Sequence, residues 1–245
     1  MVRYSVIIPQ RDCGEQLRSQ VPRLRAELDR LSLPYEILCV DDGSAPATLD
    51  VLNELLSCEP ALRLLRLAEP AGTSTALSAG IASARGEILI AIEAGDHYSV
   101  DQVPHLVARL SRLDLVFGRM RLGAWRKFWH RVGRIPRWML LGLEVRHPDC
   151  LFWAARREAV EGIHLARGMR RYLPWLVARR GFRVGDMYVD ENPSRTCLHD
   201  PRANPFDLLT AWWTCRRWRN DTAQEIRPAT IVHHELEMAA VNKKF

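Results

Sequence analysis

Short apolar segments alternate with longer segments in which leucine or valine recurs every three or four residues through the first half of the chain. The short segments have the length and composition of strands; they are Tyr4–Ile8, Glu36–Val40, Arg63–Leu67, Ile88–Ile92 and Leu115–Phe117. The spaced positions between them predict helices within residues 17–31, 49–56, 72–84 and 103–110. This alternation predicts an α/β fold built on a doubly wound, mostly parallel sheet.

Two details refine the expected sheet. Pro9 follows the first strand and is expected to end it, because proline cannot donate a hydrogen bond to a strand ladder. Residues 88–92 are apolar throughout, which is typical of a central strand that is covered on both faces.

The chain of 245 residues suits one α/β domain with at most a small appendage, and its 47% hydrophobic content is ample for a core. No run approaches the roughly 18 consecutive apolar residues of a spanning helix, and the amino terminus lacks a signal-peptide pattern. The six cysteines are scattered without a CxxC pair, which favours reduced thiols over a disulfide framework or a zinc site. We therefore expect a cytoplasmic protein.

Basic residues interleaved with tryptophan form two runs, at residues 119–141 and 206–218, which hold six of the eight tryptophans. Indoles beside Lys and Arg suit the headgroup layer of a membrane, so the protein is expected to bind the inner face peripherally. An ordinary helical hairpin with a basic face has the same composition, and single-stranded nucleic acid is the least favoured partner. The expected divisions are a main domain at 1–205, an amphipathic basic helix at 206–219 and a polar tail at 220–245.

Two adjacent carboxylates, Asp41 and Asp42, follow the second predicted strand and precede a Gly-Ser turn. In an open α/β sheet, ligands bind outside the carboxyl ends of the strands. Acidic side chains at that edge suit hydroxyls, ring N–H groups or a metal. The alternative is an acidic turn that caps the next helix.

Several segments, in order, resemble the inverting family 2 glycosyltransferases of the GT-A fold, and most of all the dolichyl- or polyprenyl-phosphate mannose and glucose synthases. The similar segments are Ser5–Pro9, Val40–Ser44, Gly72–Ile81 with Ala84–Glu87, Phe117–Arg119, Leu140–Pro148, Ala155–Ala159, Gly168–Pro174 and Arg180–Gly185. The resemblance covers roughly residues 4–195 and implies a GT-A fold with a basic, Trp-rich helical region.

The metal motif departs from the family's pattern. Where the family places Asp-x-Asp after the fourth strand, this chain has Glu93, then Gly95, with Asp96 one residue late. The resemblance implies that Glu93 and Asp96 hold Mg²⁺ or Mn²⁺ against the donor diphosphate, with Gly95 allowing the turn that brings Asp96 back. An ordinary acidic turn is the alternative.

Further departures affect the expected donor and acceptor sites. Arg11, Asp12 and Cys13 replace the usual aromatic residue, Asn and Glu, and His147 stands where an Asp is usual. Contacts with the donor are implied for Pro9, Arg11, Asp41, Asp42, Gly72, Arg119 and Arg126, and catalytic roles for Asp96, His147 and Arg171. His147 would serve as the base if the acceptor were a hydroxyl.

The resemblance therefore implies transfer of a sugar from a nucleotide-sugar donor to a polyprenyl-phosphate acceptor at the membrane surface. Two other functions remain open. One is transfer to a soluble or saccharide hydroxyl. The other is a catalytically impaired protein that acts as a nucleotide-sugar binder or scaffold, since a fold does not guarantee a function.

Overall fold

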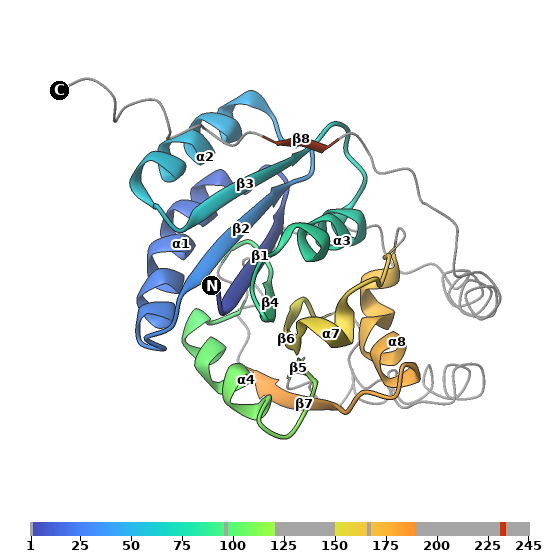
Figure 1. Ribbon diagram of the computed structural model, residues 1–245. Helices are drawn as coiled ribbons and strands as arrows, with labels where there is room; N and C mark the ends of the chain where they lie inside the picture. The colour runs from blue at the N-terminus through green and yellow to red at the C-terminus, as the bar shows by residue number, and fades with distance from the viewer. Residues whose placement is uncertain (1, 96–97, 121–149, 166–167, 190–230, 234–245) are drawn as a thin grey trace, which may run out of the picture.

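A single twisted sheet organises the computed structural model, which describes residues 2–95, 98–120, 150–165, 168–189 and 231–233. Within these residues the sheet has eight strands in the order β7-β5-β6-β4-β1-β2-β3-β8. The strands are β1 (Tyr4–Gln10), β2 (Tyr35–Asp41), β3 (Leu62–Leu67), β4 (Ile88–Ile92), β5 (Leu115–Met120), β6 (Phe152–Arg156), β7 (Val184–Val189) and β8 (Ile231–His233). Figure 1 shows the sheet running from β7 at the bottom to β8 at the top.

Strand directions follow from the pairings. Strands β1 to β4 are mutually parallel, whereas β6 runs antiparallel to both β4 and β5, so β5 and its parallel neighbour β7 share the direction of β4. The edge strand β8 is antiparallel to β3. The sheet is therefore mostly parallel, and the predicted fold class is confirmed.

Helices cover both faces of the sheet. One face carries α1 (Gly14–Asp29), α2 (Pro46–Cys58) and α4 (Val103–Arg109), and the 3₁₀ turn η1 (Val100–Gln102) precedes α4. The other face carries α3 (Thr73–Ser83), α7 (Arg157–Val160), the 3₁₀ turn η2 (Met169–Tyr172) and α8 (Leu173–Arg179). In Figure 1 the first group lies along the left side and the second on the right. Among the helices that the structure describes, none is both long and apolar enough to cross a bilayer.

Apolar residues alternate between two cores. Along β1, Val6 and Ile8 face the core beneath α1, whereas Ile7 faces the core beneath α3. All five residues of β4 are buried, and β4 lies between β1 and β6, which confirms the prediction of a covered, central fourth strand. A strand that is buried on both faces must be apolar at every position.

Pro9 does not end the first strand, so that prediction was wrong. Strand β1 continues to Gln10, with Pro9 paired opposite Val40 of β2. The ladder between β1 and β4 ends at Ile7, so Pro9 has a neighbouring strand on one side only. A strand tolerates proline where one of its sides carries no ladder.

Two expected regions lie largely beyond the described residues. The Trp-rich runs fall there except for Arg119 and Met120, and the proposed boundaries at 205 and 219 stay predictions. Residues 231–233, within the expected polar tail, form β8 and pair with Leu65–Leu67 of β3.

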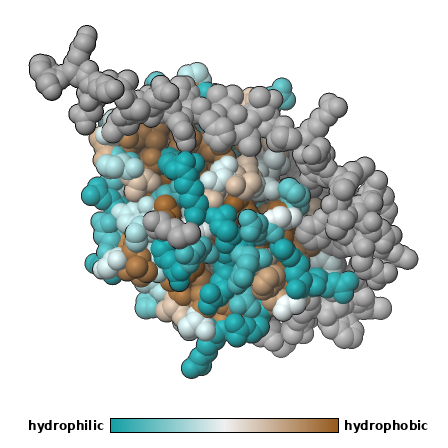
Figure 2. Space-filling view, viewed as in Figure 1, coloured by the Kyte–Doolittle hydropathy of each residue, from teal (hydrophilic) through white to brown (hydrophobic). Residues whose placement is uncertain are grey.

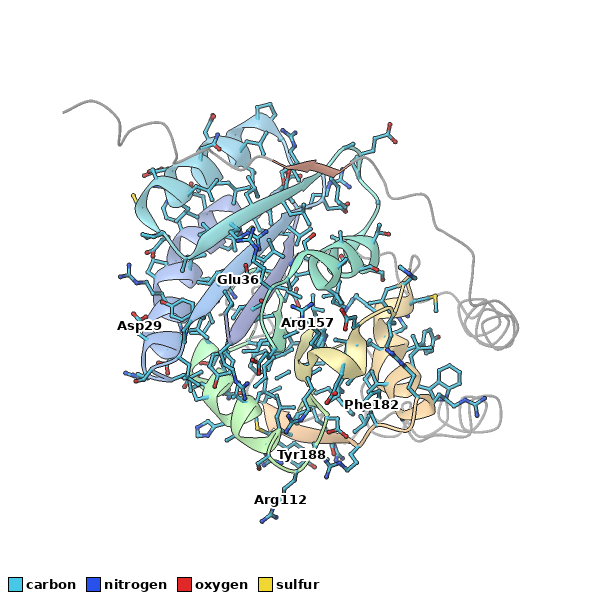
Figure 3. All side chains as sticks on the ribbon, in the orientation of Figure 1. Asp29, Glu36, Arg112, Arg157, Phe182 and Tyr188 are labelled. Atoms are coloured by element: carbon cyan, nitrogen blue, oxygen red, sulfur yellow. The ribbon has the colours of Figure 1, made fainter. Side chains whose placement is uncertain are left out.

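A buried carboxylate network anchors the loop that leads into β4. Glu36 accepts hydrogen bonds from Ser5 Oγ at 2.5 Å and from the Arg85 backbone N–H at 2.6 Å, and it pairs with Arg63. Gly86 packs so tightly here that a Cβ would lie 2.6 Å from the Ser5 nitrogen. Figure 3 shows Glu36 with Arg157 in the centre of the view. The Ala84–Glu87 motif therefore has a structural role, because the backbone of Arg85 and Gly86 is bound to Glu36 and Ser5.

Acid is expected to weaken this network. Burial raises the pKa of Glu36, but the hydrogen bonds from Ser5 and Arg85 and the Arg63 guanidinium together bring it below its ordinary value. A carboxyl group whose pKa is lower in the folded protein than in the unfolded chain stabilises the fold. This stabilisation is fully present at a pH above the pKa of the unfolded chain, about 4.3, and is lost as the pH falls through the pKa of the folded protein. The free energy of unfolding of wild type should therefore exceed that of Glu36→Gln at neutral pH, and denaturant titrations should show the difference shrinking below about pH 4. A difference that is constant with pH would contradict this assignment.

Candidate functional site

The carboxyl ends of β1 and β2 are joined by hydrogen bonds to Asp41. Asp41 is fully buried and accepts bonds from Gln10 Nε2 at 2.6 Å, from the Ser44 backbone N–H at 3.2 Å and from the Ser44 hydroxyl. Burial raises the pKa of Asp41. The hydrogen bonds from Ser44 and the guanidinium of Arg66 lower this pKa, but only in part; Arg66 Nε lies 3.5 Å from Asp41 Oδ2. Asp41 therefore shapes the turn that follows β2.

Asp42 fixes the loop before α3. Its carboxylate accepts hydrogen bonds from the backbone N–H of Ala71 at 2.7 Å and of Gly72 at 2.9 Å. Gly72 has φ +92°, in the region that favours glycine, and it directly precedes α3. Adjacent Asp41 and Asp42 thus hold two different loops at one edge of the sheet.

The loop after β1 belongs to the same cluster. Asp12, at φ +56°, accepts a hydrogen bond from the Ala45 N–H at 2.8 Å and donates its own N–H to Ser44 Oγ at 2.9 Å. Arg11 is exposed beside it, with Nε 4.0 Å from an Asp12 carboxylate oxygen. Arg11 is thus an accessible cation at the edge where the sequence predicted a ligand.

An acidic turn follows β4, the other neighbour of β1. Glu93 is 2% exposed, and Gly95 has φ +103°. Gln20 of α1, which is fully buried, donates Nε2–H to the Glu93 carbonyl at 2.9 Å and accepts the Gly95 N–H at 3.0 Å. An Asp at position 95 would be strained at this φ, so the turn as it stands requires the glycine.

Two buried arginines lie in η2. Arg170 and Arg171 are 9% and 7% exposed, and the Arg170 N–H bonds to Ser74 Oγ of α3 at 3.3 Å. The pKa of the Cys150 thiol is raised to about 12, chiefly by burial. A hydrogen bond from Tyr98 lowers this pKa; the negative charge of Glu93 raises it, and the positive charge of Arg170 lowers it. Glu93 and Arg170 therefore both lie close enough to Cys150 to act on its charge.

Arg119 has partners at the β5–β7 edge. Its guanidinium forms an ion pair with Asp186 at 3.1 Å and lies over the Tyr188 ring at 4.8 Å. Figure 3 labels Tyr188, which is 55% exposed, on β7. A phosphate contact for Arg119 stays a prediction.

The structure gathers part of the predicted set. Pro9, Arg11, Asp41, Asp42 and Gly72 lie together at the ends of β1 and β2, and Glu93 follows the neighbouring strand β4. Asp96, Arg126 and His147 lie outside the described residues, so their roles stay predictions.

The sequence interpretation missed three polar residues of the site: Gln10, Gln20 and Arg170. Gln20 carried a signal that was overlooked, since it lies between Leu17 and Leu24 on the apolar stripe of α1. A polar residue on such a stripe needs buried partners. Gln10 gave no comparable signal, because the side chains that it binds, those of Asp41 and Ser44, lie more than thirty residues away.

The residues of the acidic turn fit a divalent cation that shares its ligands with a bound phosphate. Hard cations prefer oxygen, and Mg²⁺ in phosphate-handling enzymes binds one or two carboxylates together with substrate phosphates. Glu93 supplies one such carboxylate. Among the described residues no three His, Cys, Asp or Glu side chains gather to hold a metal by themselves.

Comparison with known proteins identifies the family. The sequence profile of glycosyl transferase family 2 matches residues 5–163, which include both carboxylate clusters of the site. The chain belongs to this family. The resemblance drawn from the motifs is thereby confirmed.

Two of the curated relatives are named as polyprenyl-phosphate enzymes. The chain is 27% identical to dodecaprenyl-phosphate galacturonate synthase of Rhizobium johnstonii over 203 residues, covering 77% of this chain and 58% of the relative. It is 24% identical to undecaprenyl-phosphate 4-deoxy-4-formamido-L-arabinose transferase of Pseudomonas savastanoi, covering 86% of this chain and 65% of the relative. The chain thus spans less than two thirds of the length of either relative.

Solved structures share the fold. A mannosyltransferase from Pyrobaculum calidifontis, in complex with GDP-Man and Mn²⁺, matches with a TM-score of 0.58 at 18% identity, over 91% of this chain and 66% of that one. A glucosyl-3-phosphoglycerate synthase from Mycobacterium tuberculosis, solved with Mn²⁺, UDP and phosphoglyceric acid, gives 0.60 at 23% identity, over 86% and 74%. These similarities show that the sheet has the GT-A arrangement.

Proposed function

We propose that this protein transfers a sugar from a nucleotide-sugar donor to a polyprenyl-phosphate acceptor at a membrane surface. The observation that carries the proposal is the pair of acidic clusters on either side of β1, one at Asp41 and Asp42 and the other at Glu93. Ligands of open α/β sheets bind at that edge. The family and the names of the relatives support both the reaction and the acceptor.

The transfer requires little acid–base chemistry. An acceptor phosphate oxygen attacks the anomeric carbon as the bond from that carbon to the donor diphosphate breaks, and the nucleoside diphosphate leaves. A phosphate is already anionic near neutral pH, so positioning and electrostatic stabilisation supply most of the catalysis. His147 is needed as a base only for a hydroxyl acceptor.

The residues on the two sides of β1 have different proposed roles. Pro9, Arg11, Asp41, Asp42 and Gly72 form the wall of the donor site. Glu93, together with Asp96, would hold Mg²⁺ or Mn²⁺ against the donor diphosphate, where a cation offsets the charge on the leaving group.

Arginine side chains are the proposed contacts for the phosphates of the reaction. Arg126 and Arg171 are the proposed contacts, with Arg119 at the neighbouring β5 edge, because a guanidinium fork matches the geometry of a phosphate. The burial of Arg171, at 7% exposure, supports this assignment, since the charge of a dehydrated guanidinium acts more strongly than in water.

The decisive experiment measures transfer of labelled sugar from UDP-, GDP- and dTDP-sugars to polyprenyl phosphate with Mn²⁺. Unphosphorylated polyprenol is the matched control, because it keeps the lipid and presents only a hydroxyl. Product with the phosphate alone is expected. Product with both lipids, or with a soluble saccharide only, would favour a hydroxyl acceptor, and nucleotide binding without product would favour the scaffold.

Peripheral membrane binding is a separate prediction that rests on the Trp-rich basic runs at 119–141 and 206–218. Each Lys or Arg near an anionic surface adds about 1 kcal/mol of attraction, which salt screens. The protein is expected to co-sediment with anionic vesicles at low salt and to dissociate at high salt, with a blue shift of tryptophan emission on binding. Neutral vesicles are the control. A lack of co-sedimentation at low salt would contradict the prediction and favour a soluble acceptor.

A further inference from the structure

A side chain of α1 holds the acidic turn after β4. The Gln20 amide bonds to both ends of the turn, to the Glu93 carbonyl at 2.9 Å and to the Gly95 N–H at 3.0 Å. Gln20 is separated from these residues by more than seventy positions, so α1 supports the turn in addition to the local backbone of Gly95.

Packing alone does not account for a glutamine at this position. Gln20 is fully buried among apolar neighbours of the α1 face, where leucine would suit the core. Burying an amide without partners is unfavourable, and here both its donor and its acceptor are satisfied by backbone groups of the turn. Gly95 at φ +103° gives a turn that the strand ladder does not hold, and the amide supplies the missing support.

Helix α1 also contacts the other side of the site. The Cys13 N–H, just before the helix, donates to Gln10 Oε1 at 3.1 Å, and Gln10 in turn binds Asp41. The same helix is thus connected to both acidic clusters. Helix α1 therefore links the donor wall and the acidic turn, in addition to the strand pairing of β1 with β2 and β4.

We propose that Gln20 is a positioning residue whose amide holds the turn in the conformation that presents the Glu93 carboxylate to a divalent cation shared with the donor diphosphate. The inference rests on the proposed function. Residues that orient metal ligands commonly change metal affinity by roughly 10- to 100-fold when they are substituted. Gln20 acts through the backbone of the turn and needs no contact with substrate.

The test uses Gln20→Met, which keeps the length of the side chain and removes both hydrogen bonds. Gln16→Met is the matched control on the exposed face of the same helix, one turn earlier. Leu24→Ala, one turn later in the core, is a second control that lowers stability without touching the turn. Mn²⁺ is titrated at a fixed concentration of UDP and, separately, of GDP, and hydrogen exchange of the Gly95 amide is followed by NMR in parallel.

Gln20→Met is expected to raise the Mn²⁺ concentration for half-maximal nucleotide binding by roughly 10-fold or more and to speed exchange of the Gly95 amide. Both controls should keep the wild-type Mn²⁺ dependence. If Gln20→Met speeds exchange but leaves the Mn²⁺ dependence unchanged, Gln20 is structural only, and the inference is overturned while the proposed function stands. If wild-type binding of both nucleotides does not respond to Mn²⁺, the inference and the metal of the proposed function fall together.

Discussion

Glu93→Gln is expected to reduce sugar transfer by roughly 100-fold while nucleotide binding without metal stays near wild type. Glutamine keeps the size and one oxygen of the side chain but removes the charge that a cation needs. Metal stabilisation of a leaving group is worth several kcal/mol, and about 3 kcal/mol corresponds to a rate reduction of roughly 100-fold. The measurement is the initial rate with polyprenyl phosphate across a range of Mn²⁺ concentrations.

The burial of Glu93 makes a stability control necessary. The side chain is 2% exposed and lies close enough to Cys150 to raise the pKa of its thiol, so the substitution also changes a buried environment. Cys150→Ala is the matched variant, because it alters the same surroundings and keeps the carboxylate. A Glu93→Gln enzyme that folds, transfers sugar at the wild-type rate and keeps its Mn²⁺ response would contradict a metal role for Glu93.

The elements that the sequence predicts well are those set by local periodicity. The predicted strand at residues 88–92 matches β4 at both ends, and the predicted helix at 72–84 differs from α3 by one residue at each end. These segments are buried on defined faces, so their composition reflects their surroundings directly. Gly80 shows how closely α3 packs on the sheet, because a Cβ there would lie 2.4 Å from Ile7.

The elements that the sequence left out depend on distant partners. The antiparallel insertion of β6 between β4 and β5 is a choice of strand order, which periodicity does not encode. The short edge strand β8 has three residues, too few for a recognisable pattern. The role of Gln10 likewise appears only in the folded chain, since its hydrogen bond to Asp41 joins segments far apart in sequence. Gln20 differs, because its place on the apolar stripe of α1 was a signal in the sequence.

The family motifs divide into two groups in this chain. Ala84–Glu87 serves the amino-terminal edge of the sheet, where Gly86 packs on Ser5, and so supports the fold. Asp41, Asp42 and Glu93 lie at the opposite, carboxyl edge, where a ligand of an open sheet binds. A motif match alone did not separate these groups, because both are specified by the same kind of short, polar, glycine-containing sequence.

The distribution of hydrophilic residues on the visible surface does not separate the two groups of motifs. Figure 2 shows hydrophilic residues spread over much of the visible face, with hydrophobic residues between them. The informative polar groups are the buried ones, because an amide or carboxylate removed from water must be matched by defined partners. Gln20, Asp41 and Glu93, each at most 2% exposed, are therefore the residues to test first.

Asp41→Ala is expected to lower the free energy of unfolding by about 2–5 kcal/mol, because removal of the carboxylate leaves buried donors of Gln10 and Ser44 unmatched. Each unsatisfied buried group costs about 1–3 kcal/mol. Loss of nucleotide binding in this variant would then follow from the altered turn and would not by itself identify a donor contact.

Asp41→Asn separates the two roles. Its carbonyl oxygen can still accept the bonds that Gln10 and Ser44 make to Oδ1, so chemical denaturation should show a smaller loss of stability than for Asp41→Ala. If Asp41 contacts the base or ribose of the donor, as the resemblance implies, the folded Asn variant should bind UDP or GDP more weakly than wild type in calorimetric titrations. Nucleotide binding equal to wild type in Asp41→Asn would restrict Asp41 to shaping the turn and would leave recognition to its neighbours, with the exposed Arg11 the first to substitute.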